Sequence, residues 1–141
     1  MNKLLFTQKR VFEDLALLLL RFFIGGTFIV YAIKKVQGFD NYIILFSDKL
    51  DLPLPLFNLY IVTLVEGLGG LLLILGLFTR FISIPLIITM ITAFFLVNLD
   101  NGFAASSFGI EVPLAYISIL FLLFGFGSGK FSLDNKFLPS K

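Results

Sequence analysis

The chain of 141 residues contains no histidine, no cysteine and no tryptophan. Without imidazole it can offer neither a histidine ligand to haem nor an imidazole proton relay. Without thiols it cannot carry out thiol–disulfide exchange. We therefore expect no metal site and no self-contained set of catalytic residues, so that any redox chemistry would need a bound molecule or a partner protein.

Charged residues are also scarce, at 14% of the chain, whereas 58% of the residues are hydrophobic. The apolar residues form four long runs, at 15–33, 56–78, 81–99 and 110–126. A helix needs roughly 20 apolar residues to cross a bilayer, a length that three runs match and the fourth approaches. The sequence predicts an all-α integral membrane protein: one domain, 1–141, forming a bundle of four transmembrane helices at about 15–38, 56–78, 81–99 and 110–126.

A short amphipathic segment separates the first two runs. Its apolar residues recur at helical spacing: Phe39, Tyr42, Ile43, Phe46 and Leu50. This pattern predicts a short helix lying in the membrane interface between helices 1 and 2. The alternative is an ordinary loop with apolar side chains.

The basic residues between the runs are unevenly distributed, which predicts the orientation. The side that holds both termini and the second-to-third turn carries Lys3, Lys9, Arg10, Arg80, Lys130, Lys136 and Lys141, and the other side carries Lys34, Lys35 and Lys49. We therefore expect a multi-pass protein with both termini in the cytoplasm. The net charge of +2 reflects this topology and gives no indication of nucleic-acid binding.

Charged side chains inside the runs are candidate functional groups. Glu66 lies near the middle of the second run, where a lone carboxylate costs about 3 kcal/mol on insertion scales. Arg21 is the expected partner, and Lys35 is the competitor. The pair can be a structural clamp between helices, or it can line a polar pocket that handles a proton or a small molecule such as a quinone headgroup.

Small residues predict where the helices meet. Gly25 shares a stripe with Arg21, while Gly69 and Gly70 share one with Glu66. Glycine lets helix backbones approach closely, so these stripes are expected packing faces.

Four segments together resemble the DoxX family of small bacterial membrane proteins: RFFIGGTFIVYAIKKVQGF, VEGLGGLLLILGLFTR, AFFLVNLDNGF and GIEVPLAYISILFLLFGFGSGKFSLD. The resemblance implies a four-helix transmembrane bundle in the inner membrane and an association with redox chemistry, since some members are subunits of thiosulfate:quinone oxidoreductases and others are linked to quinone or oxidative-stress resistance. The family pattern falls on Arg21, Lys35, Glu66, Gly69, Gly70, Gly76, Arg80 and Glu111.

The chain departs from the family pattern at two positions. Many members have histidine near the outer end of helix one and after helix three, where this chain has Tyr31 and Asn98. Together with Asp100, Glu111 and Lys35, these residues are candidates for an outer polar cluster. The alternative is a solvated rim.

The resemblance implies an accessory subunit of a quinone-linked redox or detoxification system, with a quinone as the cofactor it would use. Its partners would be the lipid bilayer and a membrane or peripheral redox protein, and the oligomeric state stays open. The alternatives are a carrier or binding protein for a small amphiphilic molecule, and a structural membrane scaffold.

Overall fold

The computed structural model describes residues 2–103 and 109–137, and all regular structure within them is helical. The α-helices are α1 (Asn2–Gln37), α2 (Phe39–Ile44), α3 (Pro55–Leu75), α4 (Thr79–Ala93), α5 (Glu111–Phe126) and α6 (Leu133–Phe137). A π-helical turn, η1 (Leu45–Lys49), continues α2. A second π-helical turn, η2 (Phe94–Asn98), and a 3₁₀ turn, η3 (Leu99–Asn101), continue α4.

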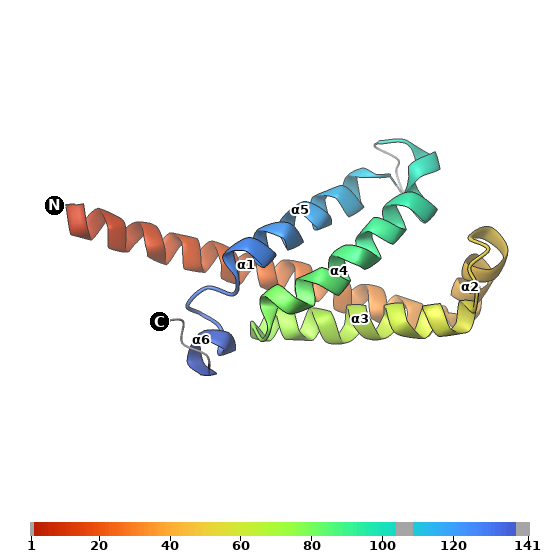
Figure 1. Cartoon of the computed structure of the whole chain (residues 1–141), viewed down its shortest axis with the longest axis horizontal. Helices are drawn as coiled ribbons and strands as arrows, with labels where there is room; N and C mark the ends of the chain where they lie inside the picture. The colour runs from red at the N-terminus through yellow and green to blue at the C-terminus, as the bar shows by residue number, and fades with distance from the viewer. Residues whose placement is uncertain (1, 104–108, 138–141) are drawn as a thin grey trace.

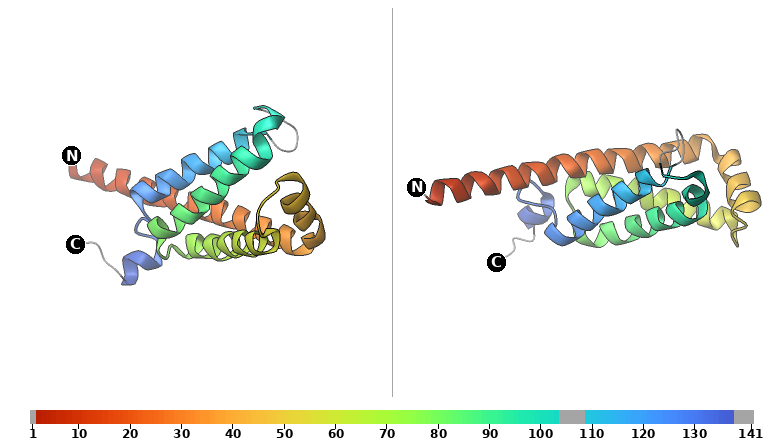
Figure 2. Two further views of the ribbon diagram at one scale, coloured as in Figure 1. Left: turned by 45° about the vertical axis from the view of Figure 1, so that its right-hand side comes forward. Right: turned by 90° about the horizontal axis from the view of Figure 1, so that it is seen from above.

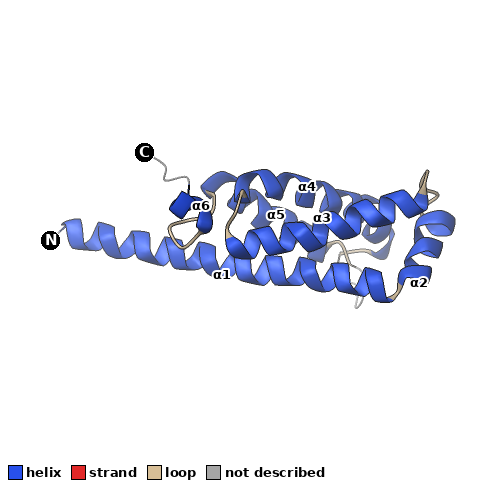
Figure 3. Cartoon of the chain, turned by 90° about the horizontal axis from the view of Figure 1, so that it is seen from below, coloured by secondary structure: helices blue, strands red, loops and turns tan. Residues whose placement is uncertain are grey.

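The long helices lie side by side in two pairs, with α1 against α3 and α4 against α5, and α4 also contacts α3 (Figure 1). Here the base is the end of this group that holds the α3–α4 turn and α6, and the apex is the end that holds α2 and η3. The N-terminal part of α1 extends past the other helices beyond the base (Figures 2 and 3). The start of α1 and the helix α6 therefore both lie on the base side.

Within the described residues, three helical stretches are long and apolar enough to cross a membrane: Val11–Gln37, Pro55–Leu75 and Thr79–Asn98. Most of each stretch is not covered by other parts of the chain. Large apolar side chains such as Phe81 and Phe23 are 73% and 64% exposed, as expected for helices that face lipid. The fourth apolar helix, α5, has only 16 residues and is shorter than the roughly 20 that a spanning helix needs.

The helix ends differ from the predicted ones for local reasons. The first helix begins at Asn2 instead of near residue 15, because its polar N-terminal residues continue the same helix. The second ends at Leu75 instead of 78, because Gly76 adopts the left-handed conformation, with φ 66°, that often ends a helix. The third loses its α-helical hydrogen bonding at Phe94, where the π-helical turn begins.

The segment predicted as a short helix between the first two long helices is helical, as α2 followed by η1. Phe46 is buried, and the ring of Phe39 lies 5.4 Å from that of Tyr60 on α3. These contacts hold the segment against the apex end of α3.

The core is formed where the two helix pairs meet. Its buried residues come from α1, α3, α4 and α5: Ile24, Phe28, Leu73, Leu86, Met90, Leu120 and Leu123. Gly25 and Gly70 lie where α1 crosses α3. Gly69 faces α4, since a Cβ on it would lie 3.1 Å from Leu86. Glycine at these points brings the helices close enough to seal the core.

Candidate functional site

A buried ion pair joins α1 to α3 near the apex. The Nζ atom of Lys35 donates a hydrogen bond to Oε2 of Glu66 over 2.5 Å. The Lys35 and Glu66 side chains are 13% and 3% exposed, respectively. Because either charge alone would be costly away from water, each side chain compensates the other. Of the two partners that the sequence left open for Glu66, the structure selects Lys35.

The expectation that Arg21 is the main partner of Glu66 is wrong. Arg21 is fully buried near the base, where its Nη2 donates to the backbone oxygen of Phe131. Its neighbour in the turn after α3 is Gly76, since a Cβ on Gly76 would collide with Nη1 of Arg21. The ten residues from Glu66 to Gly76 span about 15 Å at ~1.5 Å per residue of helix. Arg21 and Glu66 therefore lie at different depths.

Tyrosine rings flank the ion pair. The Nζ atom of Lys35 lies 5.7 Å from the ring centroids of both Tyr31 and Tyr42, which is within the roughly 6 Å range of a cation–π contact. The ring of Tyr116, on α5, lies 6.2 Å from that of Tyr31. Three of the four tyrosines in the chain therefore gather around this pair.

We call Tyr31, Lys35, Tyr42, Glu66 and Tyr116 the Lys35 cluster. It brings together side chains from α1, α2, α3 and α5. An ammonium group and phenol hydroxyls can donate hydrogen bonds to a carbonyl oxygen, while the carboxylate can accept a proton. Ionisable groups inside a membrane bundle commonly mark proton or ligand pathways. The cluster is thus the main candidate for a site that handles a small polar group.

Sequence reasoning found part of this cluster. Tyr31 stands four residues before Lys35, so helical spacing places both on one face. Tyr42 was assigned only to the amphipathic segment. Tyr116 was missed, and the signal that could have found it is its polar hydroxyl within an otherwise apolar run.

The other residues of the predicted outer polar cluster have different surroundings. Asn98 is buried at the end of η2, and its Nδ2 atom donates to the backbone oxygen of Gly109 over 3.2 Å. Asp100 is exposed in η3, and Glu111 is the first residue of α5. Asn98 thus links the end of the third membrane helix to the residues just before α5.

At the opposite end, hydrogen bonds fasten the C-terminal segment, residues 127–137, to the base. The Asp134 carboxylate accepts from the backbone N–H groups of Phe78 and Thr79, at 2.8 and 3.2 Å, and so satisfies the start of α4. The Asp14 carboxylate, on α1, accepts from the backbone N–H of Lys130 over 2.9 Å. Two carboxylates distant in sequence therefore position this segment.

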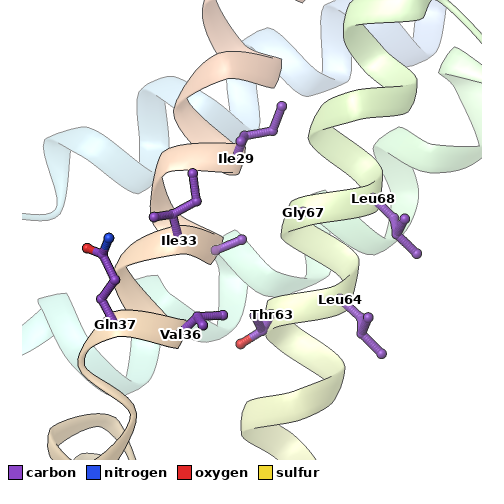
Figure 4. A pocket seen from close by; sticks show the side chains of 9 residues that line it. Ile29, Ile33, Val36, Gln37, Thr63, Leu64, Gly67 and Leu68 are labelled. Carbon is purple, nitrogen blue, oxygen red and sulfur yellow. The ribbon is translucent and has the colours of Figure 1, made fainter.

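An apolar groove of about 460 Å³ lies between α1 and α3 (Figure 4). It is lined by Ile29, Ala32, Ile33, Val36, Gln37, Thr63, Leu64, Gly67 and Leu68. The Thr63 hydroxyl is already bonded to the backbone oxygen of Leu59. Neither Lys35 nor Glu66 lines the groove. Its chemistry suits a hydrocarbon chain or an apolar ring.

No metal-binding site is visible among residues 2–103 and 109–137. No three carboxylate side chains come together there in a way that could hold an ion.

Comparison with known proteins identifies the chain's relatives. The model of the family described as DoxX matches residues 16–99. A Haemophilus influenzae protein described as "Uncharacterized protein" is 31% identical over 136 residues, covering 92% of this chain and 89% of the relative. A second such H. influenzae protein is 42% identical over 83 residues, covering 56% of this chain and 61% of the relative.

A further relative has a functional description. The Bacillus subtilis protein described as "Putative oxidoreductase CatD" is 32% identical over 94 residues, covering 67% of this chain and 68% of the relative. No solved structure matches the chain significantly.

Proposed function

The chain belongs to the DoxX family, and we propose that it is an accessory subunit of a quinone-linked redox or detoxification system in the bacterial inner membrane. Its family and its long apolar helices make it a membrane protein that contacts the lipid bilayer. What we propose is the role as a redox subunit, and it is supported by the Lys35 cluster and by the relative described as a putative oxidoreductase.

The proposed topology has four membrane spans, with α5 as the fourth. With its 16 residues, α5 would span the membrane where the bilayer is locally thinner. Both termini and the base would face the cytoplasm, because Arg80, Lys130 and Lys136 are at that end. The α2–η1 segment would lie in the outer interface, since it combines the buried Phe46 with exposed Asp48 and Lys49.

The donor set of the Lys35 cluster fits a quinone headgroup. Lys35 and Tyr31 are the residues that would donate hydrogen bonds to its carbonyl oxygens, and the tyrosine rings offer aromatic faces. When bound, the quinone would supply the electron-accepting ring that the chain itself lacks. Glu66 would hold a proton close to that ring.

The single observation that carries this proposal is the buried Lys35–Glu66 pair beside Tyr31. A clamp between helices needs only the two opposite charges. The surrounding tyrosines add hydroxyl groups that a clamp does not require, and they belong to helices on both sides of the core. A site that recognises a polar headgroup explains them.

The test is quinone retention by the purified protein. Protein solubilised in mild detergent should carry quinone that solvent extraction and mass spectrometry detect, or should bind an added short-chain quinone. Replacing Tyr31 by Phe removes a hydroxyl but keeps the ring, so Y31F should weaken binding and leave folding intact. Tyr60→Phe is the matched control, because Tyr60 is exposed and its ring packs against Phe39, which is not a member of the cluster. Equal binding by both variants and the unaltered chain would contradict the proposal.

The second candidate is a carrier or binding protein for a small amphiphilic molecule, and the observation that favours it is the apolar groove between α1 and α3. A carrier in proteoliposomes should move its compound with no change in the compound's redox state. A bulky residue in the groove, such as Gly67→Leu, should block this transport while leaving quinone binding at the Lys35 cluster unchanged. The redox-linked role predicts the opposite pattern: Y31F should weaken quinone binding, and Gly67→Leu should leave it unchanged.

A further inference from the structure

A second pocket, of about 670 Å³, opens at the base between the C-terminal segment and the α1–α3 pair. One wall is apolar and comes from the two long helices: Leu18, Phe22, Ile74 and Leu75. The other wall comes from the C-terminal segment: Lys130, Phe131, Ser132, Leu133, Asn135 and Lys136. The pocket is therefore divided into an apolar half and a half with two ammonium groups.

The charges around this pocket are mainly positive and only partly compensated. Lys130 and Lys136 are both exposed. Behind the pocket wall, Arg21 is fully buried and donates to the backbone oxygen of Phe131. Its Nε and Nη1 atoms have no hydrogen-bond partner within the described residues. The guanidinium's direct bond goes to a neutral carbonyl group, and the nearby Asp134 carboxylate offsets part of its positive charge.

The nearby carboxylates keep their negative charge, but their hydrogen bonds go to backbone groups. Asp14 accepts from the backbone N–H of Lys130, and Asp134 accepts from the backbone N–H groups of Phe78 and Thr79. Their bonds are to backbone groups and leave the Lys130 and Lys136 ammonium groups available. The same bonds fix the position of the segment that carries the two lysines, so the site is preformed.

The location fits one class of occupant. The apolar wall continues the surface of two membrane-length helices, and the lysines lie where these helices reach the base. A molecule seated there would place hydrocarbon against Leu18 and Phe22 and an anion against the lysines. We propose that this pocket binds an anionic phospholipid, with its phosphate between Lys130 and Lys136 and an acyl chain along α1 and α3. This site is separate from the Lys35 cluster and does not depend on the proposed function.

The test measures lipid binding to the full chain in detergent by native mass spectrometry. Phosphatidylglycerol and phosphatidylcholine with identical acyl chains are titrated separately, because they differ in net headgroup charge. The chain should bind phosphatidylglycerol more tightly. Replacing both lysines, as Lys130→Gln with Lys136→Gln, should weaken phosphatidylglycerol binding by roughly fivefold per lysine, or about 25-fold in total, and leave phosphatidylcholine unchanged.

Two controls keep the result specific. Lys49→Gln removes an exposed lysine at the apex and should not change binding. Soluble glycerol phosphate, which shares the phosphate but has no acyl chain, should fail to displace the lipid. Displacement by glycerol phosphate at similar concentrations would overturn the lipid assignment in favour of a free phosphate site.

A second measurement covers the case in which the double variant fails to fold. Raising the salt concentration screens exposed charges, so the unaltered chain should lose its preference for phosphatidylglycerol as salt rises. Equal affinity for both lipids at low salt, or equal loss of affinity in Lys49→Gln and the double variant, would overturn the proposal.

Discussion

Gly25 of α1 and Gly70 of α3 face each other so closely that a Cβ atom on either glycine would lie 2.5 Å from the backbone oxygen of the other. The contact is reciprocal and involves backbone atoms, which cannot move aside as a flexible side chain can. It sets the separation of the two helices that carry Lys35 and Glu66. The ion pair therefore depends on two residues that have no side chains.

Alanine at either glycine should force α1 and α3 apart. We expect Gly25→Ala and Gly70→Ala each to destabilise the protein by about 1–3 kcal/mol, as overpacking does in other closely packed interiors. Thermal unfolding in detergent measures the effect. Gly26→Ala is the matched control, because a Cβ at Gly26 meets nothing within 4 Å. A loss of stability in Gly26→Ala equal to that in Gly25→Ala would show that helix packing is not the cause.

Removing one member of the Lys35–Glu66 pair should do more harm than removing both. Lys35→Met or Glu66→Leu alone leaves a buried charge without its partner, at a cost of about 3–5 kcal/mol, whereas the double variant should recover much of this loss. Unfolding of the four proteins in a double-mutant cycle gives the coupling energy.

The same cycle with Arg21→Met in place of Lys35→Met is the control. Arg21 bonds to Phe131 at the base, so its effect should add to that of Glu66→Leu without coupling. Strong coupling between Arg21 and Glu66 would contradict the observed pairing.

Asp134 should stabilise the start of α4 from a distant part of the chain. Phe78 precedes α4 in the left-handed conformation, with φ 50°, and its N–H is held by Asp134. We expect Asp134→Ala to cost about 0.5–2 kcal/mol, the range for losing a helix cap, and Asp134→Asn to cost less because the amide oxygen can still accept one bond. Hydrogen exchange of the Phe78 and Thr79 amides reports the change directly.

Asp40→Ala is the control for this prediction. Asp40 lies in the first turn of α2, which has no side-chain cap hydrogen bond. Its replacement should therefore change the free energy of unfolding by no more than about 0.5 kcal/mol. Unchanged exchange at Phe78 in Asp134→Ala would mean that the cap contributes nothing in solution.

The proposed orientation predicts the sides reached by reporter fusions. A reporter after Lys141, which lies outside the described residues, should be active in the cytoplasm, and one inserted at Lys49 should be active outside. Four membrane spans, with the end rich in lysine and arginine in the cytoplasm, require this result. Both reporters on one side would mean an even number of spans between Lys49 and Lys141, which would rule out the three spans α3, α4 and α5, and with them α5 as the fourth span.

The helices of this protein could be predicted because their signals are local. The run from 56 to 78 is long and apolar enough to specify α3 without reference to any other segment, and only its last turn was misplaced, at Gly76. The helical spacing of Phe39, Tyr42 and Phe46 likewise predicted α2 and η1 from neighbouring residues. The switch to π-helical hydrogen bonding at Phe94 has no comparable local signal.

The candidate site could be predicted only in part. Glu66 was identified because a carboxylate within an apolar run needs a partner, and Tyr31 and Lys35 share a helical face. The choice between Arg21 and Lys35 required the depth of α1 relative to α3, which neither run encodes alone. Tyr116 joins the cluster from α5, and nothing in the order of the chain relates it to Tyr31.

The sequence by itself determined that the chain forms long apolar helices suited to a membrane, because the length and composition of each run decide whether that run can face lipid. The tertiary structure decided that Glu66 pairs with Lys35, that Arg21 bonds to Phe131 and that Asp134 caps α4. These contacts join residues from 31 to 110 positions apart. They depend on how far one helix is shifted along another, and the close contact of Gly25 with Gly70 fixes that shift for α1 and α3.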